Sequence, residues 1–341
     1  MVHEPAPASY GWNVVESSWS GERFGLRQAD GSLPPALTYQ GWLHRDAAEA
    51  LAVRAGTTLE QWHADAIAPG FRAKTLPLRL AAMFETSERE IEADNIVGAV
   101  PGSTNDDEAI VITAHWDHLG LSPTPIDGDV VFNGAVDNAS GIAGMLGVAA
   151  SLREQVAAGT GPKRRVVFLA TTAEEQGLLG SRYYAEHPLV PIDKIVAVAN
   201  LDSMNVHGRT KSVVVVGAGQ STLEDTLADV VAKQGRHTIP DDRPEGGGYY
   251  RSDHFSFARR GVPALYFRGS TDLVDGGSAA GAAVAKLRSE RYHTVHDEYD
   301  PNWSLEGALQ DVEALVDLVL RVANADQRPA WKPASEFGNA G

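Results

Sequence analysis

The stretch EAIVITAHWDHLG, residues 108–120, passes from an apolar, β-branched segment directly into two histidines and an aspartate. Apolar runs of this kind are typical of strands buried inside a sheet. His115, Asp117 and His118 therefore stand where a buried strand ends, and their side chains are of the types that bind metal ions. Whether they form a site depends on what stands at the ends of the other strands.

Short apolar runs alternate with helical patterns from residue 95 onward. Strands are predicted over residues 95–100, 109–114, 165–171, 195–201, 213–217 and 263–267. Helices are predicted over 141–158, 178–187, 223–235 and 305–323. This alternation is typical of a largely parallel sheet that helices cover on both faces. We therefore predict an α/β fold, a three-layer α/β/α sandwich with a mixed, mostly parallel central sheet.

The first ninety or so residues differ from this pattern. Helices are expected over 44–56 and 58–67, and alternating apolar residues predict a half-buried strand over 76–84. We expect a small α+β segment over residues 1–93, the main domain over 94–330 and a tail over 331–341. Residues 269–290 are rich in Gly and Ala with little periodicity, which indicates a mobile loop beside the site that acts as a lid.

Composition excludes several classes of function. The 45 acidic residues outnumber the 29 basic ones, and a net charge of -16 disfavours nucleic acid as a partner. Without cysteine, any metal must be held by His, Asp and Glu. No apolar run is long enough to cross a membrane as a helix. The first residues lack the pattern of a signal peptide, which suits a cytosolic protein or the mature form of an exported one.

Acidic and imidazole side chains follow three of the predicted strands. His115 and Asp117 follow the strand of 109–114, Glu174 and Glu175 follow that of 165–171, and Asp202 follows that of 195–201. The carboxyl ends of such strands are where open α/β sheets bind their ligands. Each residue taken alone is explained equally well as a helix cap or turn residue. Their joint placement at one edge of the sheet favours a functional site.

Two further segments complete this set of side chains. NGAVDNASG (133–141) is a turn that carries Asp137 at the start of a helix, and RYHTVHDEYD (291–300) carries His293 and His296. A site for two divalent cations needs a bridging ligand and further ligands on each ion. Imidazole nitrogens and carboxylate oxygens suit zinc, and a neighbouring carboxylate that binds no metal can accept a proton from water. The residues therefore favour a two-metal hydrolytic site.

The motifs AHWDHLG, NGAVDNASG, TAEEQGLLGS, NLD and YHTVHDEYD together resemble the M28 family of co-catalytic zinc metallopeptidases, especially bacterial aminopeptidases. The resemblance spans roughly residues 94–325. It implies two Zn²⁺ ions, with Co²⁺ or Mn²⁺ as substitutes, and peptides as substrates. His115 and Asp202 would hold one ion, Glu175 and His293 the other, and Asp137 would bridge them. The family also has a cis peptide bond after the bridging residue, here Asp137–Asn138.

The resemblance assigns roles to further residues. Glu174 matches the general base, and Asp117 matches the carboxylate that orients the first histidine ligand. Tyr292 matches a tyrosine that stabilises the oxyanion in some relatives. In the segment 249–267, Asp253 and His254 match positions close to the substrate pocket. His296 departs from the family pattern, because relatives carry a residue there that binds no metal.

Several rival functions fit parts of the chain. The segment VVVVGAGQSTLEDTLADVV (213–231) looks like a dinucleotide site, but Thr222 replaces the third glycine. A glutaminyl cyclase shares the fold with one zinc ion, and receptor-like modules share it with lost ligands; neither accounts for a complete set of five ligands. A carboxypeptidase or dipeptidase would need basic residues to bind the substrate carboxylate, and Arg251, Arg268 and Arg291 are candidates.

The N-terminal residues bear on where the protein works. Residues 1–93 resemble the trailing part of a protease-associated domain, which is an insertion found in larger members of the family. Relatives with this architecture are usually exported. The resemblance thus implies a periplasmic or secreted protein, and the expected activity is that of an aminopeptidase.

Overall fold

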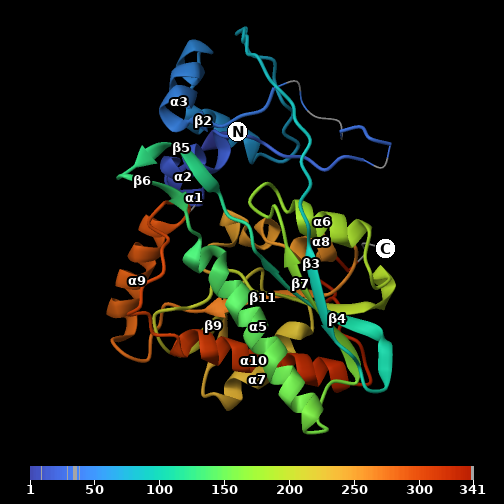
Figure 1. Ribbon diagram of the computed structural model, residues 1–341. Coiled ribbons are helices and arrows are strands. Elements are labelled where there is room, and N and C mark those ends of the chain that lie inside the picture. The colour runs from blue at the N-terminus through green and yellow to red at the C-terminus, as the bar shows by residue number, and fades with distance from the viewer. Residues whose placement is uncertain (9, 29, 34–36, 38, 339–341) are drawn as a thin grey trace.

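The computed structural model describes residues 1–338 except 9, 29, 34–36 and 38. Its centre is a seven-stranded sheet with the order β10-β9-β11-β8-β4-β7-β3 (Figure 1). The strands are β3 (Ile96–Val100), β4 (Asn105–His115), β7 (Arg164–Thr171), β8 (Ile195–Asn200), β9 (Ser212–Val215), β10 (His237–Pro240) and β11 (Ala264–Gly269). β3 is antiparallel to β7 and β11 is antiparallel to β9, whereas the other neighbours are parallel.

Helices cover both faces of this sheet. On one face lie α5 (Ser140–Ala157), α7 (Leu223–Lys233) and α10 (Glu306–Asn324), and on the other lie α6 (Leu179–Glu186) and α8 (His254–Ala258) (Figure 1). Successive side chains of β4 point to opposite faces of the sheet. Ile110 and Ile112 pack in the hydrophobic core under α5, α7 and α10, while Ala109 and Val111 pack in the core under α6 and α8. The predicted three-layer α/β/α sandwich with a mixed, mostly parallel sheet is therefore confirmed.

The helix that follows the Asp137 turn is apolar and long. The stretch Ala135–Ala157 has the length and composition of a membrane span. In this fold it is a core helix, because Met145, Val148 and Leu152 pack into the hydrophobic core between the sheet and α10. Its apolar character is thus explained by burial within the domain.

The N-terminal segment contains short elements at one end of the molecule (Figure 1). These are β1 (Val2–His3), α1 (Pro5–Ala8), α2 (Trp12–Trp19), β2 (Leu43–His44), α3 (Arg45–Arg54) and α4 (Leu59–Ala66). The two helices expected over 44–56 and 58–67 match α3 and α4. The strand expected over 76–84 is wrong: residues 71–95 are irregular, and Leu80 and Met83 are 80% and 99% exposed. Among the described residues no strand pairs with this stretch, so its alternation does not produce a strand.

Two other stretches differ from expectation. A small hairpin of β5 (Gly120–Ile126) and β6 (Asp129–Phe132) follows β4 in the sequence and precedes the turn that carries Asp137. The loop expected over 269–290 is largely a helix, α9 (Gly277–Arg291). Gly281 is the one residue of α9 that is buried. An exposed helix needs no apolar stripe, which is why its sequence lacks a helical period.

Candidate metal centre

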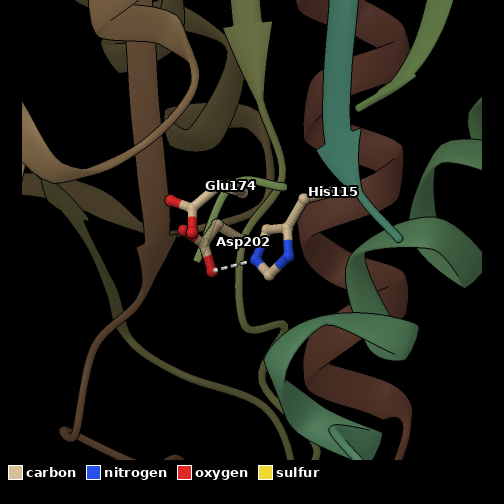
Figure 2. Close-up of side chains that lie close together, drawn as sticks. All are labelled: His115, Glu174 and Asp202. Atoms are coloured by element: carbon tan, nitrogen blue, oxygen red, sulfur yellow. Dashed lines mark ion pairs between the residues drawn. The ribbon is translucent and has the colours of Figure 1, made fainter. Parts of the chain in front are cut away.

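The residues expected to bind metal converge at the carboxyl end of the sheet. His115 is the last residue of β4, Glu174 and Glu175 follow β7, and Asp202 follows β8. Asp137 lies in a short turn, Ala135–Ala139, that leads into α5, and His293 follows α9. The side chains of His115, Glu174 and Asp202 point toward one another (Figure 2). All these side chains are largely shielded from solvent.

Asp137 lies between two histidines. Its Oδ1 is 3.2 Å from Nε2 of His115, and its Oδ2 is 3.3 Å from Nε2 of His293. The same nitrogen of His115 is 3.7 Å from Oδ1 of Asp202, and that of His293 is 3.2 Å from Oε2 of Glu175. The Asp137–Asn138 peptide bond is cis, as the resemblance implies. Each end of Asp137 thus faces one imidazole and one further carboxylate.

These spacings fit ligands of a shared ion. Two ligand atoms bound tetrahedrally to one zinc at about 2.0–2.1 Å lie about 3.3 Å apart. The nitrogen–oxygen distances of 3.2–3.7 Å around Asp137 are close to this value and longer than strong charge-assisted hydrogen bonds. Four carboxylates buried together also require compensating positive charge. The donor set therefore fits two zinc ions, although other divalent metals share this chemistry.

The two central histidines are held by their second ring nitrogen. Nδ1 of His115 is 3.0 Å from the backbone oxygen of Asp117, and Nδ1 of His293 is 2.7 Å from Oγ of Ser18. Both contacts leave Nε2 facing Asp137. Such partners fix the orientation of a histidine that binds metal. Ser18 lies on α2, so the N-terminal segment contributes directly to this centre.

Asp117 acts on the centre differently from the sequence-based expectation. Its carboxylate is 3.8 Å from Nδ1 of His115, too far for a hydrogen bond, and it accepts from the backbone N–H groups of Glu174 (3.0 Å) and Glu175 (3.3 Å). Burial raises the pKa of Asp117 to about 6. The backbone carbonyl orients His115, while the carboxylate positions the loop that carries both glutamates.

Three supporting contacts were not anticipated from the sequence. Nδ1 of His118 is 2.8 Å from Oε1 of Glu175, and the hydroxyl of Ser252 donates to Oδ2 of Asp202 at 2.7 Å. The carboxylate of Asp297 accepts from the N–H of Asp137 at 2.9 Å. The position of His118 within AHWDHLG gave a signal, because it follows the same strand as His115. Nothing in the local sequence connects Ser252 or Asp297 to these partners.

Glu174 and Glu175 have different electrostatic surroundings. Burial, together with the charges of Glu175, Asp253 and Asp202, raises the pKa of Glu174 well above its usual range. Burial also acts to raise the pKa of Glu175, but His293 and the hydrogen bond with His118 outweigh it and hold that pKa at about 2. Glu175 is therefore engaged by cationic partners, while Glu174 is a buried carboxylate with a high proton affinity.

The two residues expected at the substrate pocket lie elsewhere. Asp253 and His254 are fully buried, at 0% exposure. Asp253 accepts a hydrogen bond from Thr171, and His254 packs between Tyr249 and Tyr266, where burial lowers its pKa to about 3. Both belong to the protein interior behind the site, so the pocket assignment is wrong. The assignment rested on the family resemblance alone, and at the start of α8 both side chains are buried.

Of the remaining candidates, Tyr292 lies at the centre and His296 lies outside it. Tyr292 stacks on His293 with ring centroids 3.9 Å apart and lines the cavity, as does Tyr10 of the N-terminal segment. His296 is exposed and pairs with Asp127 at 3.0 Å, away from the centre. His293 is thus the histidine of this motif that lies in the site.

A cavity of about 850 Å³ opens onto this centre. Its lining includes His115, Asp137, Glu174, Asp202 and His293. Val14, Ser18 and Trp19 of α2 also line this cavity. The space is large enough for a small portion of a peptide, and it places that portion directly against the metal-binding side chains.

The family model described as Peptidase family M28 matches residues 95–316. The chain belongs to peptidase family M28. The expected family is therefore confirmed, and with it the class of zinc-dependent hydrolases. The match covers the whole sheet and every candidate ligand, and it ends within α10. Ser18, which contacts His293, lies outside the matched region.

Curated relatives match part of this M28 chain. A "Probable zinc metalloprotease" of Pyrenophora tritici-repentis is 34% identical over 112 residues, which is 33% of this chain and 24% of that protein. "Aminopeptidase YwaD" of Bacillus subtilis is 33% identical over 96 residues, covering 28% of this chain and 18% of that one. The matched stretches thus span about a quarter or less of these relatives.

Solved structures share the fold of the M28 domain. The LapA aminopeptidase of Legionella pneumophila aligns with a TM-score of 0.50 at 22% identity, covering 68% of this chain and 55% of that one. LapB of the same organism aligns with a TM-score of 0.51 at 22% identity, covering 68% and 56%. At this level of identity the similarity establishes the architecture.

Proposed function

We propose that this chain is a di-zinc aminopeptidase that hydrolyses the N-terminal peptide bond of its substrates. The observation that carries the proposal is the position of Asp137, whose two oxygens each face one histidine and one further carboxylate. His115 and Asp202 would hold one ion, and His293 and Glu175 the other. Both sets open onto the same cavity.

Zinc ions held here would supply Lewis acidity, which makes water nucleophilic near neutral pH and polarises a carbonyl group. The chain's own residues would handle the protons. Glu174 accepts the proton of the attacking water and then donates it to the amide nitrogen as the C–N bond breaks. Glu174 lies beside His115 and Asp202, so its carboxylate is within the proposed centre without being assigned to a metal ion. Tyr292 would donate a hydrogen bond to the oxyanion.

The acidic lining of the cavity supports the choice of aminopeptidase, because carboxylates can bind a free amino group. Besides the three carboxylates assigned to metal, those of Glu174 and Asp297 also line the cavity. A cationic N-terminus is stabilised in such surroundings. A carboxypeptidase or dipeptidase of the same fold is the second candidate, because arginines also line the cavity. A cyclase with one zinc is less favoured, since two complete ligand sets are present.

The test combines metal content with substrate preference. Protein stripped by chelation and reconstituted should bind about two zinc ions per chain, and zinc or cobalt should restore activity. A peptide library with free and blocked termini should show cleavage that requires a free N-terminus. Saturation at one ion would favour the cyclase, and a requirement for a free C-terminus would favour the carboxypeptidase.

We also propose the domain organisation and location of the protein. Residues 1–93 are a partial protease-associated segment, residues 94–330 the catalytic domain and residues 331–341 a tail, and the protein works in the periplasm or after secretion. The support is the resemblance of this arrangement to exported relatives. Fractionation of cells with an antibody against the chain tests the location, and recovery in the cytoplasm alone would contradict it.

A further inference from the structure

Three arginines lie together in the wall of the cavity. Arg268 is near the end of β11, and Arg288 and Arg291 are in the last turn of α9. All three line the same cavity as His115, Asp202 and His293, and all are half-buried. We call Arg268, Arg288 and Arg291 the arginine cluster.

The arginine cluster has no directly paired acidic partner among the described residues. Within the described part of the chain, none of the three guanidinium groups forms an ion pair or a side-chain hydrogen bond. Other shielded arginines are paired: Arg236 contacts Asp311 at 2.8 Å and Arg164 contacts Glu108 at 2.5 Å. A chain with 45 acidic residues thus leaves arginines unpaired in its main cavity.

The positive groups also act on one another. Burial, together with the charge of Arg268, lowers the pKa of Arg288 to about 10. Burial and the charges of Arg288 and Arg291 lower the pKa of His207, which lines the same cavity. Tyr266, Asp202 and Asp137 partly offset the effect on Arg288, but both carboxylates already face His115. Like charges that act on one another are stabilised when an anion binds between them.

A simpler explanation accounts for only part of the cluster. Basic residues in the last turn of a helix are stabilised by the helix dipole, which applies to Arg288 and Arg291 on α9. It does not apply to Arg268, which belongs to a strand. It also does not explain why these side chains line the cavity beside the candidate metal site. What the three arginines share is that they line the same cavity.

We propose that the arginine cluster is a substrate subsite that binds a peptide carboxylate close to the scissile bond. Guanidinium groups bind carboxylates through paired, charge-assisted hydrogen bonds, which gives both affinity and orientation. The carboxylate is either an Asp or Glu side chain or the free C-terminus of a short peptide. This subsite rests on the proposed peptidase function, and it refines that function to acidic or very short substrates.

Matched peptides distinguish the two sources of the carboxylate. The reference is Leu-Gln-Ala amide; the others place Glu at the second position, place Glu at the first position, or leave the C-terminus free. For at least one carboxylate-bearing peptide, kcat/KM should exceed the reference by about tenfold or more, mainly through a lower KM. The peptide that gains identifies the source. Equal kcat/KM for all four peptides would overturn the proposal.

Variants test whether the cluster causes the preference. Arg268→Gln and Arg288→Gln should each lower kcat/KM for the preferred carboxylate-bearing peptide more than for the reference peptide, and so remove most of the gain. Arg288→Lys keeps the charge without the paired geometry, so it should retain part of the preference. Lys286→Gln is the control, because Lys286 is exposed on the same helix and pairs with Glu290. Equal losses for all four peptides in the arginine variants would indicate a structural role and refute the subsite.

Binding separates this inference from the proposed activity. Glu174→Gln, loaded with zinc, should bind the preferred acidic peptide at least about tenfold more tightly than the reference in titration calorimetry. Adding Arg288→Gln should remove that difference. If the protein cleaves no peptide yet shows this binding preference, the peptidase proposal fails and the subsite stands. If it cleaves peptides without any such preference, the subsite fails and the peptidase proposal stands.

Discussion

Glu174 and Glu175 are adjacent in sequence but differ in what they contact. Glu175 faces His293 at 3.2 Å and His118 at 2.8 Å, while Glu174 lies with His115 and Asp202 without an imidazole hydrogen bond. This difference gives the two carboxylates different expected roles, one as a metal ligand and one as a base. Substitution of each by Gln, which keeps the shape of the side chain, separates the roles.

We expect Glu174→Gln to abolish proton transfer without loss of metal. Metal content should stay near that of the wild type, and kcat should fall by about 10²–10⁴, the usual contribution of a positioned acid–base group. KM should change little. Elemental analysis and steady-state kinetics on the same preparation measure both quantities. Loss of metal from this variant would reverse the two roles.

We expect Glu175→Gln to weaken one metal site instead. A neutral amide is a poorer zinc ligand than a carboxylate, and His118 and His293 would lose their anionic partner. Zinc titration should show one weakened site, and excess zinc should recover part of the activity. If this variant retained normal zinc affinity and full activity, Glu175 would not be a ligand.

The candidate ligands could be predicted residue by residue, but their supporting contacts could not. His115, Asp137, Glu175, Asp202 and His293 stand in short motifs whose order and composition carry information. By contrast, which side chains near these motifs become buried depends on how distant segments pack. For this reason Asp253 and His254 were wrongly predicted to line the pocket. The contact between Ser18 and His293 joins residues 275 apart, a distance that no local pattern spans.

At the scale of elements, helix α2 contributes more than packing. It presents Ser18 to His293 and places Val14 and Trp19 in the wall of the cavity. The partner of the second ring nitrogen fixes the tautomer and orientation of a metal-binding histidine. The N-terminal segment therefore contributes contacts to the candidate metal centre.

We expect Ser18→Ala to reduce zinc affinity at the site that contains His293 by about 10–100-fold. Ser18→Thr keeps the hydroxyl and should preserve more of that affinity. Ser17→Ala is a matched control on the same helix, because the Ser17 hydroxyl bonds only to helix carbonyls of Asn13 and Val14. Competition with a chromogenic chelator measures the affinities without an activity assay. Equal affinity in Ser18→Ala and Ser17→Ala would contradict the role of α2.

The elements that were predicted correctly are those with a buried face. Most strands and helices of the sandwich show a hydrophobic period because one or both faces pack into a core. The edge strand β3 is an exception, since of its residues only Val100 is buried. Helix α9 was predicted as a loop because it buries almost nothing. The hairpin of β5 and β6 was missed although its turn, Asp127–Gly128, has positive φ at both residues and a sequence typical of tight hairpins.

At the scale of the whole molecule, the metal ions should contribute to folding. Asp137, Glu174, Glu175 and Asp202 are packed together and shielded from water, and their charges repel one another without cations. The alternation of strands and helices sets the architecture without metal. Without metal, His115 and His293 supply part of the compensating charge, because the neighbouring carboxylates outweigh burial and raise the pKa of both imidazoles. Bound cations would supply more.

We expect removal of zinc to lower the melting temperature by several degrees. A ligand present at 100 times its Kd stabilises the folded state by about 2.7 kcal/mol. Thermal unfolding followed by circular dichroism, with chelator and after zinc is restored, measures the change. The shift should be smaller in Glu175→Gln, which has one weakened site. An unchanged melting temperature after complete removal, verified by elemental analysis, would show that the centre adds nothing to stability.

The contact between α2 and His293 has a consequence for the order of events during synthesis. Ser18 is translated 275 residues before the histidine that it contacts. The proposed centre is therefore incomplete until His293 has been translated and α2 has docked against the later-made domain. We expect a nascent chain that has not reached this point to lack the proposed peptidase activity.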